Sequence, residues 1–114
     1  MYSQGDILLI PIPFSDLTSS KKRPVIVLSN SIYNQKTEDI LVAAITSNLY
    51  EKEYSVLITN EYMKEGTLKV TSSIRIDKIY TLSKFIVIKK FGSAKPELME
   101  QVKMQLFKLL EETR

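Results

Sequence analysis

The sequence predicts an α+β fold, a small curled β-sheet or barrel followed by a C-terminal α-helix that packs on it. Two observations carry this prediction. Five or six short apolar runs rich in β-branched residues follow one another as far as residue 90. After Pro96 the spacing of the apolar residues changes from that of strands to that of a helix. The 114 residues suffice for one modest core, so we expect a single domain, residues 1–114.

The first three apolar runs predict strands at residues 7–10, 25–28 and 40–46. Pro11 and Pro13 follow the first run and mark its exit or an edge position. The second run is a continuous Val-Ile-Val-Leu, which is typical of a buried strand. Three further strands are predicted at residues 54–59, 68–76 and 85–90, with alternation cleanest in the first of them.

The segment from Pro96 onward predicts an amphipathic helix. Pro96 suits the first turn, and Glu97 and Glu100 complement the positive end of the helix dipole. Lys103 and Lys108 are expected to face water. The apolar face is expected to consist of Leu98, Val102, Leu106 and Leu109, with Met99 and Leu110 beside them.

The composition restricts the chemistry that this chain can carry out. It contains no cysteine and no histidine, so it lacks the commonest general base and the commonest metal ligands. We therefore expect neither a metal nor a cofactor. The net charge of +3 is compatible with a polyanionic partner. The sequence shows no signal peptide or membrane span, so we expect a cytoplasmic protein without a membrane partner.

Arg23 is the first candidate for the functional site. It stands where the second strand begins, and Pro24 behind it biases Arg23 toward an extended backbone. A guanidinium at a strand mouth suits an anionic ligand, because its planar fork can grip a phosphate with two hydrogen bonds. The alternative is an ordinary surface residue, or one paired with Asp6 or Asp16.

Two further polar segments could contact a ligand. The third strand ends on Thr46, Ser47 and Asn48, which could donate hydrogen bonds to a phosphate or a ribose or could simply form a turn. In residues 72–78, alternation puts Ser73, Arg75 and Asp77 on one face, which the residues alone favour as an exposed strand face. Lys78 could hold a phosphate or pair with Asp77.

Lys21 and Lys22 form a basic loop together with Arg23. With tyrosines nearby in the sequence, such a loop suits single-stranded RNA, although tyrosines are also common in β-sheet cores. The aromatic residues in question are Tyr33, Tyr50 and Tyr54.

Two of these motifs carry a family resemblance. A Gly5-Asp6 pair leads to a loop that closes on Arg23-Pro24, and a strand of the form Val-Ala-Ala-Ile ends on Thr46. In both respects, and over nearly the whole chain, the sequence resembles the PemK/MazF-like toxins of type II toxin–antitoxin systems. The resemblance implies an SH3-like barrel with a C-terminal helix.

The resemblance also implies an activity and its residues. It implies a sequence-selective endoribonuclease that cleaves single-stranded mRNA without metal, through 2′-hydroxyl attack to a 2′,3′-cyclic phosphate. Arg23 and Thr46 would be catalytic. The substrate would be bound by Lys21, Lys22, Ser47, Asn48, Ser73 and Arg75.

The implied partners are a second copy of the chain, in a homodimer, and a cognate antitoxin with an acidic, flexible tail. DNA would be bound only through the complex with that antitoxin. Two alternatives stay open from the sequence. One is a toxin of the same fold that binds a protein such as gyrase and cleaves nothing, and the other is a non-catalytic RNA-binding module.

Overall fold

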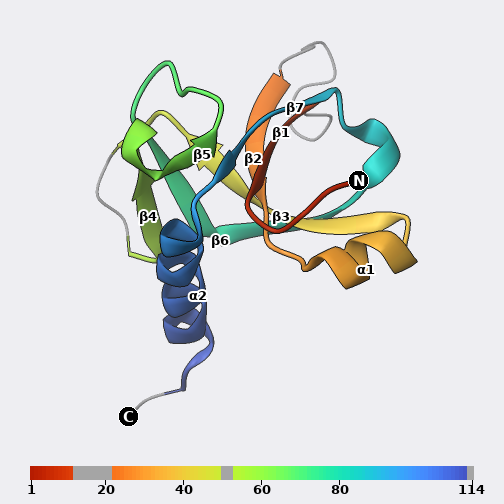
Figure 1. Ribbon diagram of the computed structural model, residues 1–114. Helices are drawn as coiled ribbons and strands as arrows, with labels where there is room; N and C mark the ends of the chain where they lie inside the picture. Colours follow the sequence, from red (N-terminus) through yellow and green to blue (C-terminus); the bar gives the residue numbers. More distant parts are fainter. Residues whose placement is uncertain (12–21, 50–52, 113–114) are drawn as a thin grey trace.

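The computed structural model describes residues 1–11, 22–49 and 53–112, and these form seven strands, two α-helices and two short 3₁₀ helices (Figure 1). The strands are β1 (Asp6–Pro11), β2 (Lys22–Val27), β3 (Asp39–Thr46), β4 (Ser55–Ile58), β5 (Met63–Glu65), β6 (Ser72–Ser83) and β7 (Lys89–Ala94). The helices are α1 (Ser31–Lys36), η1 (Asn60–Tyr62), η2 (Lys84–Ile86) and α2 (Pro96–Leu110).

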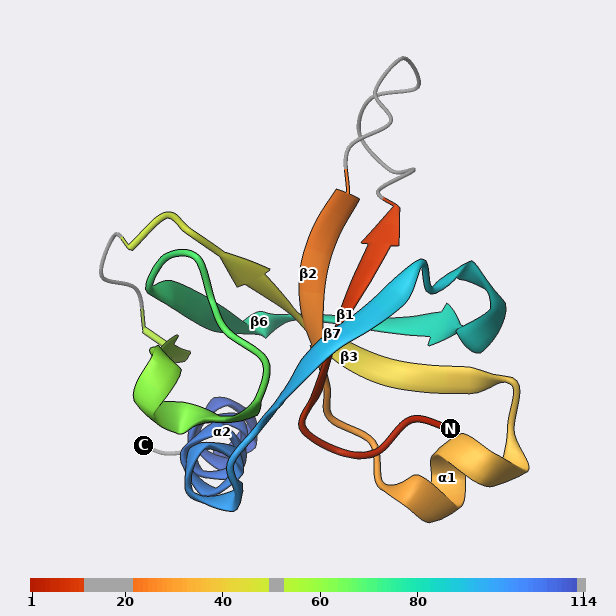
Figure 2. The ribbon, with the colours of Figure 1, turned by 45° about the horizontal axis from the view of Figure 1, so that its top comes forward.

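All strand pairs are antiparallel, in the order β4-β6-β3-β2-β1-β7-β5. The two edge strands, β4 and β5, are separated along the chain only by residues 59–62. So short a connection between the two ends of the strand order forces the sheet to curl until its edges approach each other (Figure 2). The predicted α+β fold, a curled sheet with a C-terminal helix, is confirmed.

Both faces of the central strands are buried. Ile7 and Ile26 belong to the core cluster that also contains residues of α2, whereas Leu8, Val25 and Val27 belong to a second cluster on the opposite face. Successive residues of a strand point to opposite faces, so a strand covered on both sides must be apolar throughout. This explains the continuous apolar runs in β1, β2 and β3.

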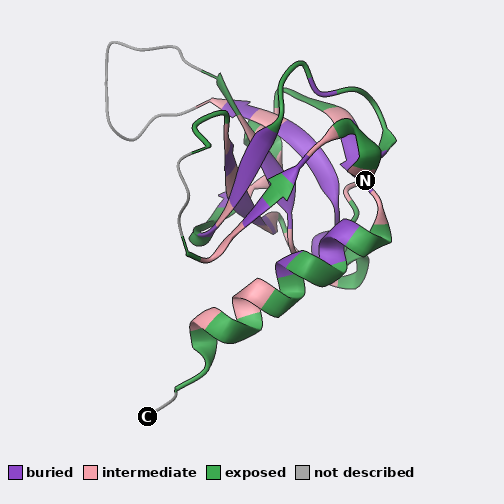
Figure 3. Ribbon diagram, turned by 90° about the vertical axis from the view of Figure 1, so that its left-hand side faces the viewer, coloured by how far each residue is buried: buried purple, intermediate pink, exposed green. Residues whose placement is uncertain are grey.

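Helix α2 begins at Pro96, as predicted, and packs on the sheet through its first turns. Leu98, Met99 and Val102 are buried, while Leu106 and Leu109 are half-buried against the same cluster. The C-terminal half of the helix extends past the sheet (Figure 3). The prediction that the remaining apolar residue, Leu110, belongs to the buried face is therefore wrong, since its exposed fraction is 74%.

Two strand predictions need correction. The strand predicted at residues 68–76 begins only at Ser72 and continues to Ser83, because Leu68 is held in a loop by Asn60, whose side chain bonds both its N–H and its C=O. The segment predicted as a strand at 85–90 starts as η2, capped by the Ser83 hydroxyl, and becomes β7 only at Lys89.

Helix α1 was not predicted from the sequence. It has six residues and starts at Ser31, directly after its N-cap residue Asn30, whose side-chain oxygen accepts a hydrogen bond from the N–H of Tyr33 at 2.8 Å. The expected strand at 54–59 is β4, two residues shorter, and Pro11 ends β1 as expected. Pro13 lies outside the described residues.

Candidate functional site

Arg23 is the second residue of β2, paired in register with Ile10 of β1, and is exposed. Asp6, one carboxylate considered for it, is buried and engaged elsewhere. Its Oδ1 lies 3.3 Å from the Lys90 Nζ, and its Oδ2 accepts from the N–H of Ser3 at 2.8 Å. Asp16 lies outside the described residues. Within the described chain, no carboxylate pairs with the Arg23 guanidinium, so this charge is available to an anionic ligand.

A hollow of about 330 Å³ brings three of the predicted site residues together. Arg23 from β2, Thr46 from the end of β3 and Arg75 from β6 all line it, with Lys78 and Tyr80 beyond them. Arg23 and Thr46 lie close together because β2 and β3 are antiparallel neighbours, so the Arg-Pro start of β2 lies beside the polar end of β3.

The Thr46 hydroxyl is oriented by its own turn. Its Oγ1 accepts a hydrogen bond from the backbone N–H of Asn48 at 3.1 Å. A hydroxyl group can accept and donate at once, so this bond leaves the hydroxyl hydrogen for a ligand in the hollow. Asn48 itself is exposed and lines neither this hollow nor the larger one described below.

Arg75 is held by Asp77 rather than standing alone. Its Nε donates to Asp77 Oδ1 at 3.0 Å, and its Nη2 donates to Asp77 Oδ2 at 2.9 Å. These hydrogen bonds lower the pKa of the Asp77 carboxyl and raise the pKa of the Arg75 guanidinium. The ion pair considered between Asp77 and Lys78 is therefore replaced by one with Arg75, and the other guanidinium nitrogen, Nη1, remains for a ligand.

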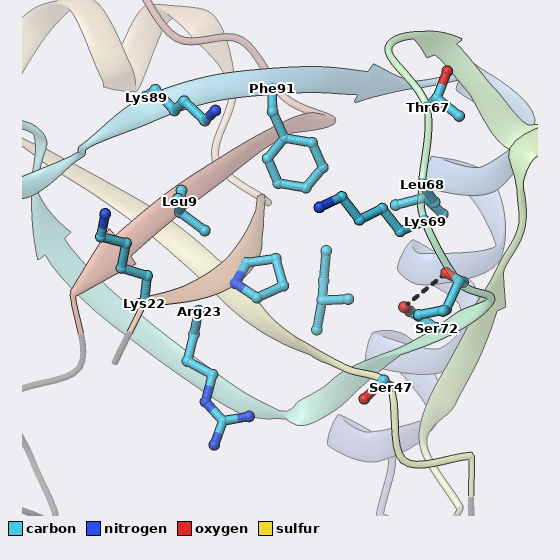
Figure 4. Close-up of a pocket in the computed structure, with 13 residues that line it drawn as sticks. Leu9, Lys22, Arg23, Ser47, Thr67, Leu68, Lys69, Ser72, Lys89 and Phe91 are labelled. Atoms are coloured by element: carbon cyan, nitrogen blue, oxygen red, sulfur yellow. Dashed lines mark hydrogen bonds between the residues drawn. The ribbon is translucent and has the colours of Figure 1, made fainter. Parts of the chain in front are cut away.

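A larger hollow of about 810 Å³ shares Arg23, Pro24 and Ile45 with the smaller one (Figure 4). Its thirteen described lining residues include four cations and no carboxylate. Lys22 and Ser47, both predicted as substrate contacts, line it together with Arg23. The apolar part of the lining includes Leu9, Pro24, Ile45 and Phe91.

One predicted contact, Ser73, stands apart from these hollows. Ser73 is buried, with 7% of its surface exposed, and lines neither of them, whereas its neighbour Ser72 lines the larger one. In the sheet Ser73 lies opposite Thr46 on one side and Leu57 on the other. Lys21 lies outside the described residues.

Three residues of the larger hollow with charged or aromatic side chains were not identified from the sequence. Lys69, Lys89 and Phe91 come from the loop at residues 66–71 and from β7, segments in which the sequence predicted strands with other boundaries. The only local signal was the closely spaced Lys89-Lys90-Phe91, which has the interleaving of cations and aromatic rings found in sites for single-stranded nucleic acid.

We searched the described residues for clusters of metal-ligating side chains and for helices long enough to cross a membrane. Among them, no group of three or more acidic side chains is arranged to hold a metal ion. No helix in the described ranges is both long and apolar enough to span a bilayer.

A family model for the PemK-like, MazF-like toxins of type II toxin–antitoxin systems matches residues 3–110. The chain belongs to this family. The resemblance seen in the Arg23-Pro24 and Thr46 motifs is thereby confirmed. No curated protein matches the chain by sequence.

Solved structures of MazF-like toxins have the same fold. An endoribonuclease from a mycobacterial species, in complex with its cognate antitoxin, superposes with a TM-score of 0.79 at 17% identity, covering 99% of this chain and 100% of that one. MazE-MazF from Deinococcus radiodurans gives 0.78 at 19% identity, with 98% of each chain covered. The Mycobacterium tuberculosis toxin MazF-mt6 gives 0.76 at 15% identity, covering 96% of this chain and 99% of that one.

Proposed function

We propose that this PemK/MazF-like chain is a sequence-selective endoribonuclease toxin that cleaves single-stranded mRNA without a metal ion. The observation that carries the proposal is the meeting of Arg23 and Thr46 in one hollow, flanked by a second hollow whose described lining is cationic. The similarity to structures named as endoribonucleases and MazF toxins supports it.

The chemistry matches these side chains. The RNA 2′-oxygen attacks the adjacent phosphorus, its proton leaves, and the bond from phosphorus to the 5′-oxygen breaks as that oxygen gains a proton. The products are a 2′,3′-cyclic phosphate and a 5′-hydroxyl. Negative charge builds up on the phosphoryl oxygens in the transition state, where fixed donors are most effective. Arg23 supplies a permanent positive charge with two parallel donors, and Thr46 donates to a non-bridging oxygen.

The remaining predicted residues hold the substrate in this proposal. Lys21 and Lys22 attract the phosphate backbone near Arg23, and Ser47 and Asn48 donate to phosphate or ribose at the end of β3. Arg75 reaches an oxygen through Nη1 while Asp77 fixes its orientation. Ser73 lines neither hollow, and it contributes by positioning Thr46, its partner in the sheet.

The test of this function is cleavage of RNA in the presence of excess EDTA. With no histidine or cysteine in the chain and no metal in the mechanism, we expect the cleavage rate to be unchanged by chelation. Each cleavage should give one fragment that ends in a 2′,3′-cyclic phosphate and one that begins with a 5′-hydroxyl, as measured by mass spectrometry. Activity that disappears in EDTA and returns with magnesium would contradict the mechanism.

The partners form part of the same proposal. A cognate antitoxin with an acidic, flexible tail would inhibit the toxin by covering the larger hollow and competing with RNA for Arg23. DNA would be bound only through that complex. Because mRNA is the substrate, the toxin would act in the cytoplasm.

We expect a homodimer that uses the apolar surface of α2. Met104, Phe107 and Leu110 are exposed on the helix half that extends past the sheet, Phe107 to 68%. Burying such a patch against a second copy would remove it from water. Phe107→Glu should shift the protein from dimer toward monomer at micromolar concentration in sedimentation, while Lys36→Glu on α1 should not. A wild-type monomer under the same conditions would rule out this assembly.

A further inference from the structure

The larger hollow contains a feature that cleavage at Arg23 does not itself require. The Phe91 ring lines the hollow, and the amines of Lys69 and Lys89 extend toward it from opposite sides (Figure 4). Arg23 lies apart from this group, at the edge of the same hollow. The three side chains come from β7 and from the loop at residues 66–71.

The loop that presents Lys69 is fixed in place. Leu68 is buried, and the Asn60 side chain accepts from the Leu68 N–H at 2.7 Å and donates to its C=O at 3.2 Å. The Ser72 hydroxyl donates to the C=O of Val70 at 3.2 Å. At the start of the loop, a Cβ added to Gly66 would lie 2.3 Å from the Phe91 carbonyl oxygen, so loop and strand are in close contact. Lys69 is therefore held near Phe91 before any ligand arrives.

The charges of this group are not neutralised within the described chain. The nearest cation along β7, Lys90, is paired with Asp6 and Glu65, at 3.3 and 3.7 Å. Lys69 and Lys89 have no such pair with a described residue, and the described lining of the hollow contains no carboxylate. Two unpaired amines on either side of a partly buried aromatic ring favour a ligand that has one flat ring and several negative charges.

We propose that Phe91, Lys69 and Lys89 form a nucleotide-binding subsite next to the scissile phosphate, in which one RNA base stacks on the Phe91 ring while the two lysines bind the phosphates on either side of it. This inference rests on the proposed function, because it adds a second contact point for the same RNA strand. Stacking on an aromatic ring is worth about 1–3 kcal/mol per base and tolerates any base. The subsite therefore contributes affinity and positioning, and it leaves the bond-breaking step to Arg23.

Binding is measured with a fluorescein-labelled 2′-O-methyl RNA oligomer of mixed sequence, which cannot form a cyclic phosphate. Phe91→Leu, which keeps an apolar side chain on the core, should raise Kd by roughly five-fold to a hundred-fold. Lys69→Gln and Lys89→Gln should each reduce the slope of log Kd against log salt by about 0.7. Phe85→Leu and Lys36→Gln are the matched controls, since both side chains are exposed outside the hollow, and neither should change Kd.

A spectroscopic variant separates stacking from a structural role. The chain has no tryptophan, so Phe91→Trp provides a single fluorophore at the subsite. Its emission should be quenched when the oligomer binds, and Phe85→Trp emission should stay constant. Circular dichroism confirms that each variant is folded.

The outcomes distinguish this inference from the proposed function. If wild type cleaves unmodified RNA but the Phe91 and lysine variants bind the oligomer as tightly as wild type does, the subsite is wrong and the endoribonuclease stands. If wild type binds without cleaving and the variants bind weakly, the subsite stands and the endoribonuclease is wrong. If the Phe91 and lysine variants bind RNA as tightly as wild type does but lose affinity for an acidic peptide, the hollow is a protein-binding surface and the subsite is wrong.

Discussion

Arg23→Ala is expected to slow the cleavage of bound RNA on the order of 10³-fold while weakening RNA binding only modestly. Arg23 has no carboxylate partner among the described residues, so removing its charge breaks no described ion pair of the fold. An interaction that strengthens as charge builds up on the phosphoryl oxygens lowers the barrier more than it tightens the ground state. The measurement is the single-turnover rate at saturating RNA, together with the dissociation constant.

Two comparison variants make this result specific. Arg23→Lys should recover little of the rate, because a single ammonium cannot reproduce the two parallel donors of the guanidinium. Lys22→Ala removes a charge one residue away, also at the larger hollow, and should weaken binding without slowing the turnover of bound RNA. If Arg23→Ala cleaves bound RNA at the wild-type rate, the ribonuclease assignment of this site fails and the RNA-binding module takes its place.

Gly66→Ala is expected to destabilise the fold by about 3 kcal/mol, because it combines two unfavourable terms. Gly66 has φ +83°, a backbone conformation that L side chains rarely adopt. The added Cβ would also lie 2.3 Å from the Phe91 carbonyl oxygen, so β7 and the loop at residues 66–71 must separate. The urea midpoint of unfolding gives the change in free energy, and the separation should also weaken RNA binding through displacement of Lys69.

Gly5→Ala separates the cost of the positive φ from the cost of the steric overlap. Gly5 also has a positive φ, +94°, but its added Cβ would meet its nearest neighbours at an ordinary contact distance of 3.5 Å. It should therefore cost only the backbone term, about 1–2 kcal/mol, with RNA binding unchanged. Equal losses for the two variants would show that the contact between the loop and β7 contributes nothing.

Features that depend on neighbours along the chain could be predicted from the sequence. Pro96 and the recurrence of apolar residues every three to four positions defined α2, and the continuous apolar runs defined β1, β2 and β3 as strands. The Arg23-Pro24 and Thr46 motifs indicated the family. These signals are local, since helix periodicity and strand alternation are set by residues a few positions apart.

Which side chains meet depends on the tertiary fold and could not be predicted from the sequence. The register of β3 against β6 shifts between Ala43 and Ala44, whose partners are Ile79 and Arg75, so local alternation could not fix the facing of every residue on β6. Leu68 is buried in a loop because Asn60, eight residues earlier, satisfies its backbone. Lys69 and Lys89 line the larger hollow together with Arg23, although they are remote from it in the chain. They meet because strands distant in the sequence pair with each other, and such pairing produces no periodic pattern in the sequence.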